Sequence, residues 1–272
     1  MNARTLGGLA ALGLTTATLA ATAENPPALE EAIDSPFSIE VSTDILSDYV
    51  WRGTICNDNP VWQPSVTLAY DAGDYGKLSG NVWSSLDLTH KRGTATNSRR
   101  SCGLQEIDYT LSYAVDLFDL GFEVGHIWYT FPNANGSSDQ DLYATISYEN
   151  DILTPSASLY WNYSDSAGTD ISSVYASFTL SHEFTLEAVS EDLTLTPSAS
   201  LGFGDNAYTD VGAELTDQTI GISAAYALSK NVSVGAQINY TWTPSHTLRH
   251  AGYMSEDKDQ VVWGGVNLTL GF

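Results

Sequence analysis

The amino-acid sequence alternates between apolar and polar residues from Phe37 onward. In the first alternating segment the apolar positions are Phe37, Ile39, Val41, Ile45, Tyr49 and Trp51. A period of two residues is typical of a β-strand with one apolar face and does not fit a helix. We therefore expect a first strand that continues through Trp51, with Asp48 and Arg52 on its polar face.

The same alternation recurs in further segments, which makes twelve predicted strands in all. The later segments lie at residues 66–70, 78–88, 107–115, 120–128, 142–148, 159–163, 174–180, 193–203, 220–228, 232–242 and 262–272. Short turns and longer polar loops alternate between them, a pattern typical of an all-β, up-and-down antiparallel barrel of the outer membrane. Phe184, Leu186 and Ala188 leave open a short additional strand.

Residues 1–23 have the composition of a secretory signal peptide. Arg4 precedes an apolar stretch, and small residues follow at Ala21 and Ala23. A membrane-anchor helix is the alternative, but the stretch is short and rich in Ala, Thr and Gly, whereas a spanning helix needs about 20 strongly apolar residues. We expect a signal peptide at 1–23, a periplasmic leader rich in Pro and acids at 24–36, and the barrel at 37–272.

The composition of the polar face indicates which side of the barrel points outward. A soluble barrel or sandwich would also alternate, but its water-exposed face would normally carry lysines along the strands. Here Ser, Thr, Gly, Asn and Gln dominate the polar face, and the lysines after the signal peptide lie in turns or loops at Lys77, Lys91, Lys230 and Lys258. We therefore expect the apolar face to contact lipid and the polar face to line a lumen.

Large aromatic residues gather where the predicted strands meet their connections. Two aromatic girdles are typical of a membrane barrel, because amphipathic rings favour the two interfaces with water. The tryptophans fall toward the long loops and the tyrosines toward the short turns, at Trp51, Trp62, Trp128, Trp161, Trp242 and at Tyr70, Tyr113, Tyr148, Tyr226. The final strand alternates up to Phe272, like the terminal strand that the barrel-assembly machinery of the bacterial outer membrane recognises.

The overall negative charge argues against two classes of binding partner. The chain has 10 Lys and Arg against 33 Asp and Glu, a net charge of -23, which argues against binding to nucleic acid or docking onto anionic lipid. Aromatic residues make up 11% and charged residues only 16%, so the chain can bury enough surface to fold.

Three short segments near the start of the barrel resemble a known family. They are Leu46-Ser47-Asp48-Tyr49-Val50-Trp51-Arg52-Gly53, Pro60-Val61-Trp62-Gln63 and Gly80-Asn81-Val82-Trp83-Ser84-Ser85-Leu86-Asp87. In these residues the chain resembles the TorF family of outer-membrane porins of Gram-negative bacteria, whose members carry a similar S-D-Y-x-x-R-G motif. The resemblance covers residues 45–88, and Cys56 departs from the family pattern. It implies a barrel more firmly than it implies transport.

If the apolar face contacts lipid, the lumen is lined mainly by acids. The predicted lining residues are Glu40, Asp44, Asp48, Arg52, Asp87, Glu106, Asp108, Glu123, Asp141 and Glu149. An acidic passage of low dielectric constant concentrates cations. A plugged barrel stays the alternative, because twelve strands enclose a space only moderately wider than side chains can fill. Small polar-face residues on the last five strands favour the passage.

Two further expectations concern an arginine and a pair of cysteines. We expect Arg52 to pair with acids on neighbouring strands and to help set a constriction. Cys56 and Cys102, in the first two long loops of an exported chain, are expected to form a disulfide; two free thiols are the alternative.

The loops hold other polar clusters. Basic residues gather in the second long loop at Lys91, Arg92, Arg99 and Arg100; they could contact lipopolysaccharide phosphates, although a solvated loop is the favoured interpretation. Acids that could offer ligands to calcium occur at Asp205, Asp210, Glu214 and Asp217, without the spacing of a known calcium loop, so solvation is favoured.

The five histidines do not show the spacing of a zinc site. His126 interrupts an apolar face and is the candidate base of a lipid-modifying enzyme, but spacing supplies no serine partner for it. We therefore expect no enzyme and no cofactor. The sequence favours a porin-like channel for small solutes in the outer membrane of a Gram-negative bacterium, in contact with lipid and lipopolysaccharide. A plugged barrel with a role at the cell surface is the alternative.

Overall fold

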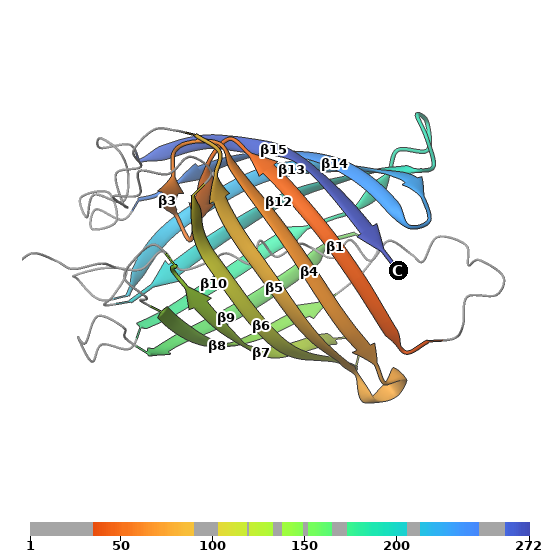
Figure 1. Cartoon of the computed structure of the whole chain (residues 1–272), viewed down its shortest axis with the longest axis horizontal. Helices are drawn as coiled ribbons and strands as arrows, with labels where there is room; N and C mark the ends of the chain where they lie inside the picture. The colour runs from red at the N-terminus through yellow and green to blue at the C-terminus, as the bar shows by residue number, and fades with distance from the viewer. Residues whose placement is uncertain are drawn as a thin grey trace, which may run out of the picture.

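The computed structural model describes residues 35–89, 103–118, 120–132, 138–148, 152–164, 173–205, 213–244 and 259–272. Twelve antiparallel strands form a closed barrel (Figure 1). They are β1 (Phe37–Leu46), β4 (Val61–Asp71), β5 (Lys77–Asp87), β6 (Leu104–Leu117), β7 (Leu120–Thr130), β8 (Ser138–Tyr148), β9 (Thr154–Ser164), β10 (Ser173–Ser181), β12 (Leu193–Gly204), β13 (Glu214–Ser229), β14 (Val232–Trp242) and β15 (Gln260–Gly271).

The barrel closes through its first and last strands. β1 pairs with β4 on one side and with β15 on the other, so that Val41 lies opposite both Val66 and Leu270. The backbones of Ile39 and Phe272 exchange two hydrogen bonds of 2.9 Å. Because every barrel strand has two partners, the barrel leaves no open edge. The predicted twelve-stranded antiparallel barrel is confirmed.

The outer face of the barrel is apolar. Leu68, Leu111, Ile220 and Val262 are each more than half exposed on it, as lipid-facing residues of a membrane barrel would be. Eight of the nine predicted girdle residues also lie exposed on this face, namely Trp62, Trp128, Trp161, Trp242, Tyr70, Tyr113, Tyr148 and Tyr226. The predicted orientation of the two faces is therefore confirmed.

The two ends of the barrel differ in their connections. At the turn end, β4 and β5 are joined through the short 3₁₀ helix η1 (Gly73–Tyr75), at the lower right of Figure 1. The opposite end, where β1 finishes and β4 begins, is called the loop end here. The additional strand left open by the sequence exists as β11 (Phe184–Thr185), which pairs with β12, but the barrel itself keeps twelve strands because β10 also pairs with β12.

The predicted extent of the first strand is wrong. β1 ends at Leu46, and the following residues form a separate hairpin of β2 (Tyr49–Trp51) and β3 (Thr54–Asn57). Trp51, expected in the outer girdle, is only 3% exposed and packs with other buried side chains.

No helix in the described ranges is both long enough and apolar enough to span a bilayer.

Candidate functional site

The β2–β3 hairpin is built on a tight two-residue turn. Trp51 pairs with Thr54, which leaves Arg52 and Gly53 at the turn, with φ angles of 43° and 77°. Two positive φ angles are the mark of a type I′ turn, whose twist suits a hairpin. A left-handed conformation costs a non-glycine residue about 1–2 kcal/mol, so contacts elsewhere must hold Arg52 in place.

The turn reaches the far wall of the barrel. Arg52 Nη2 lies 2.9 Å from Asp141 Oδ2 on β8, and β8 is separated from β1 by β4, β5, β6 and β7 along the sheet. On another part of the wall, Thr243 Oγ1 donates a hydrogen bond of 2.7 Å to the carbonyl of Gly53. The hairpin therefore crosses the lumen. This corrects the expectation that Arg52 lies on the first strand and pairs with its neighbours.

The guanidinium of Arg52 is enclosed by aromatic rings. Its Cζ lies 4.3 Å from the ring centroids of Trp51 and Tyr160 and 4.6 Å from that of Tyr175. Arg52 and Asp141 are almost completely buried. A buried ion pair offsets its desolvation only when other contacts satisfy both partners, and here cation–π contacts supply them on the arginine side.

Other side chains of the barrel wall donate hydrogen bonds to the carboxylates at this end of the lumen. Tyr129 donates to Asp141 Oδ2 at 3.1 Å. Tyr175 donates to the carboxylate of Asp217 at 3.2 Å, and Thr216 Oγ1 donates to the same carboxylate at 2.8 Å. Asp217 is therefore part of the lumen wall, and the solvated role predicted for it is wrong.

The base of the hairpin is held by β6. Tyr49 donates a hydrogen bond of 3.0 Å to Glu106 Oε2 on β6, and its ring packs against Trp83 at 5.6 Å. Asn57 Nδ2 donates to Gln105 Oε1 at 3.0 Å. Together with the contacts of Arg52 and Gly53, these bonds hold both the base and the turn of the hairpin inside the barrel.

Side chains around the hairpin fill the lumen at the loop end. Each of the twelve barrel strands contributes a buried residue near its loop end, namely Leu46, Val61, Ser85, Glu106, Tyr129, Asp141, Asn162, Tyr175, Gly202, Asp217, Thr241 and Trp263. We call this set the buried belt. Toward the turn end, lumen-facing side chains such as Ser112 and Glu123 are partly exposed. The lumen is thus occluded at one end and open to water toward the other.

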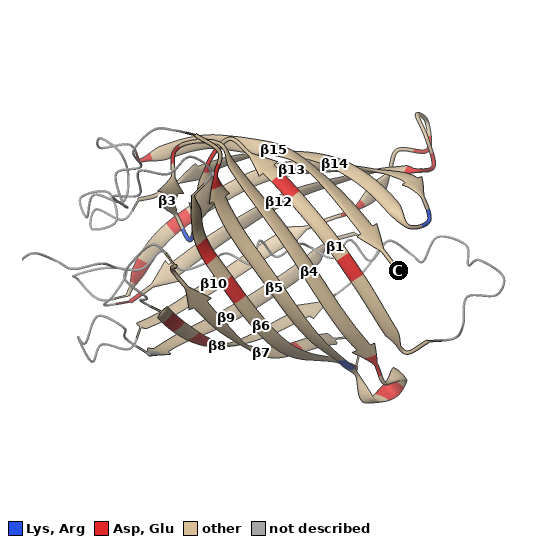
Figure 2. Cartoon of the chain, viewed as in Figure 1, with Lys and Arg blue, Asp and Glu red and all other residues tan. Residues whose placement is uncertain are grey.

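The predicted lining residues fall into distinct places. Four lie in or beside the buried belt: Asp87, Glu106, Asp108 and Asp141. Three lie elsewhere in the lumen: Glu40 is exposed near the turn end, while Asp44 and Glu123 are half-buried, with Tyr143 donating to Glu123. Asp48 precedes the hairpin and lies on no strand. Red ribbon segments, which are Asp and Glu, mark several strands in Figure 2, whereas blue segments of Lys and Arg are few.

Several predicted residues lie outside the described part of the chain: Glu149, Cys102, Lys91, Arg92, Arg99 and Arg100. Cys56 lies on β3 and forms no disulfide with a described residue; its thiol points toward the carbonyl of Thr54. Burial, followed by the nearby carboxylates of Glu106 and Asp108, raises the pKa of this thiol well above its usual range. The disulfide stays a prediction.

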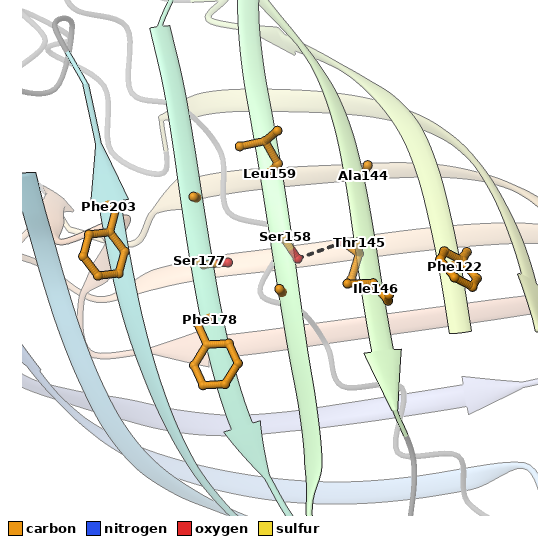
Figure 3. A pocket seen from close by; sticks show the side chains of 11 residues that line it. Phe122, Ala144, Thr145, Ile146, Ser158, Leu159, Ser177, Phe178 and Phe203 are labelled. Atoms are coloured by element: carbon orange, nitrogen blue, oxygen red, sulfur yellow. Dashed lines mark hydrogen bonds between the residues drawn. The ribbon is translucent and has the colours of Figure 1, made fainter. Parts of the chain in front are cut away.

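Two further features lie on the outer face of the barrel. His126 Nε2 lies 2.8 Å from the Tyr163 hydroxyl and 3.1 Å from Gln140 Oε1, among lipid-facing residues. Farther along this face, Phe178 on β10 and Phe203 on β12 border a shallow apolar groove that extends over Ala157 (Figure 3). Within the ranges described, no three His, Cys, Asp or Glu side chains are placed to hold a metal ion.

The sequence did not indicate Tyr160, Tyr175, Asp217 or Thr243 as parts of this site. Tyr160 and Tyr175 alternate with lipid-facing residues, as in Tyr160 before Trp161, so the sequence could have predicted that they face the lumen. It could not have predicted their contact with Arg52, because that contact depends on the hairpin folding inward.

Comparisons with known proteins agree with this fold. A model of the Gcw_chp family, described as bacterial proteins of unknown function, matches residues 30–263. The COG4313 outer membrane channel from Pseudomonas putida F1 is 11% identical with a TM-score of 0.52, over 91% of this chain and 99% of the channel. The KdgM porin in complex with disordered oligogalacturonate is 11% identical with a TM-score of 0.47, over 86% and 99%.

The translocator domain of the autotransporter NalP from Neisseria meningitidis is 12% identical with a TM-score of 0.49, over 88% of each chain. No curated protein matches the sequence. At these identities the Pseudomonas channel supports the fold alone. The matching family carries a name other than TorF, so that resemblance stays a prediction, while the barrel that it implied is confirmed.

Proposed function

We propose that this chain, which belongs to the Gcw_chp family of bacterial proteins of unknown function, is an outer-membrane channel for small solutes whose lumen the β2–β3 hairpin constricts. The observation that carries the proposal is the hairpin itself, which crosses a lumen of largely polar residues. Arg52 is held by Asp141 on β8, and the Gly53 carbonyl is held by Thr243 next to β14, across the barrel from β8. The fold shared with an outer-membrane channel is consistent with it.

Selection in such a channel would depend on width and charge, without a covalent step. The acids Asp44, Glu123 and Asp141 face the lumen, and Arg52 is buried beside Asp141. Low-dielectric walls strengthen the field of these acids. We expect the channel to prefer cations over anions.

Conduction requires the hairpin to shift, because the buried belt fills the lumen around it. The shift would break the Arg52–Asp141 ion pair and the Tyr49–Glu106 hydrogen bond. It would leave the barrel intact, since Leu46 of β1 pairs directly with Val61 of β4 below the hairpin. The hairpin therefore acts as a gate in this proposal.

The second candidate function is a plugged barrel that presents its outer loops at the cell surface. The buried belt favours it, because every strand contributes a buried residue to the occluded end. The basic residues of the second long loop, for which the sequence favours solvation over contact with lipopolysaccharide, would then be candidates for this surface role. In both cases we expect export through the periplasm and insertion by the barrel-assembly machinery into the outer membrane of a Gram-negative bacterium.

Current across a planar bilayer containing the purified full-length barrel, under a potassium chloride gradient, tests the proposal. We expect discrete steps with a reversal potential that favours potassium. Replacing the hairpin by a short turn should raise the open fraction. Silence from both forms, each verified as folded, would overturn the channel proposal and leave the plugged barrel.

A further inference from the structure

The surroundings of Arg52 have the composition of a binding site for an organic cation. Two of the three enclosing rings, Tyr160 on β9 and Tyr175 on β10, belong to the barrel wall, as does the paired carboxylate of Asp141 on β8. Trp51 alone comes from the hairpin. A wall of rings and carboxylates therefore stays in place when the hairpin moves.

This wall holds more carboxyl groups than the one that Arg52 pairs with. Asp141 Oδ2 accepts from Arg52 and Tyr129, while Asp141 Oδ1 is buried without a hydrogen-bond partner among the described residues. Asp217, also buried, accepts a hydrogen bond from Tyr175, one of the rings that enclose Arg52. Withdrawal of Arg52 would leave buried carboxylates uncompensated, which is unfavourable unless another cation takes its place.

The shape of the site selects the kind of cation. Tyr143, Tyr160 and Tyr175 follow one another on adjacent strands, with ring centroids 5.5 Å and 6.2 Å apart. Such rings bind planar or alkylated nitrogen cations through their faces, whereas a divalent metal requires a cage of oxygen ligands. Arg52 itself shows that a guanidinium fits.

We propose that the wall formed by Asp141, Tyr160, Tyr175 and Asp217 is a binding site for small organic cations that carry a guanidinium group, and that Arg52 occupies it as a tethered ligand. The inference rests on the proposed channel and names its solute class. A solute of this class exchanges with Arg52 on Asp141, and the hairpin turn leaves the wall as it does so.

Binding of methylguanidinium to the full-length barrel in detergent, followed by saturation-transfer NMR, tests the proposal without any current. In the Arg52→Ala variant the site is vacated, and we expect binding at least about tenfold tighter than in the unmodified chain, where Arg52 competes. Adding Asp141→Asn should weaken that binding about tenfold. Adding Asp44→Asn, a lumen change on β1 away from the site, should leave it unchanged.

Absence of binding to a folded Arg52→Ala barrel, or binding that Asp141→Asn does not weaken, would overturn the proposal. If the alanine variant does not fold, alkylation of Cys56 in a Cys102→Ser chain gives the second measurement. Methylguanidinium chloride should accelerate it relative to potassium chloride at equal concentration, because the hairpin is displaced; equal rates would refute the exchange. Because neither measurement records conduction, failure of this binding proposal can be told apart from failure of the channel proposal.

Discussion

Arg52 and Gly53 show how a strained turn is stabilised by what it touches. A type I′ turn favours residues such as Asn and Gly, yet Arg52 occupies its first central position. The sequence predicted correctly that Arg52 would pair with an acid. It could not identify Asp141, because residue alternation gives the face of each strand but not the path of a hairpin through the lumen.

We expect Gly53→Ala to displace the hairpin turn. An added Cβ would lie 2.6 Å from Cβ of Asp217, and the residue has a φ of 77°. Displacement should speed alkylation of Cys56 in a Cys102→Ser chain. Gly73→Ala is the matched control, because Gly73 has a φ of 62° but nothing within 4 Å of the added Cβ. Similar alkylation rates in both variants would argue against a tightly docked turn.

The raised pKa of Cys56 predicts a pH dependence. In the reduced Cys102→Ser chain, the docked thiol should react with iodoacetamide more slowly than a free thiol at pH 8.5, because less thiolate is present. Docking of the hairpin should also depend on pH. It is strongest below the ordinary thiol pKa and weakens as pH rises above that value, because the Cys56 thiol ionises more readily when the hairpin is undocked. A rate profile that follows an ordinary thiol pKa would contradict the burial of Cys56.

At the scale of elements, alternation predicted the barrel strands well and the hairpin poorly. The barrel strands follow a period of two because one face meets lipid and the other the lumen. The segment Tyr49–Trp51 instead has three consecutive large apolar residues, all buried. Three in a row indicate burial on both faces, and this signal, followed by Arg52 and Gly53, could have separated the hairpin from β1.

Replacing residues 47–60 with a two-residue Asn-Gly turn should leave the barrel folded. Leu46 and Val61 already pair at the ends of β1 and β4, and Asn-Gly suits a tight hairpin. We expect unchanged β-sheet circular dichroism and a larger single-channel conductance. As a control, shortening the β4–β5 connection at the turn end should not change conductance. A folded barrel with unchanged conductance would show that the hairpin does not set the constriction.

At the scale of the whole molecule, the charge of the lumen predicts a dependence on salt. The preference for potassium should weaken as ionic strength rises, since the Debye length falls from about 10 Å at 0.1 M to about 3 Å at 1 M. Reversal potentials at fixed concentration ratios measure this. Glu123→Gln, in the half-buried part of the lumen, should reduce the preference, whereas Glu187→Gln, at an exposed position outside the barrel strands, should not. A preference independent of salt would point to size selection instead.

The fold of the whole molecule was predictable because the alternation of apolar and polar residues repeats in twelve segments and the aromatic girdles support it. A local error, such as the extent of β1, does not change the predicted barrel. The filling of the lumen was not predictable. The polar face reads the same whether Glu106 and Asp141 face water or pack against a hairpin, because burial there depends on contacts between distant parts of the chain.

The seam between β1 and β15 also constrains how the molecule is made. Val41 finds Leu270 only after more than two hundred intervening residues have been synthesised, so barrel closure has a very high contact order. Until then β1 keeps an unpaired edge that could recruit another chain. The polypeptide therefore has to be kept from pairing with other chains until its two ends meet, and the high contact order favours slow closure.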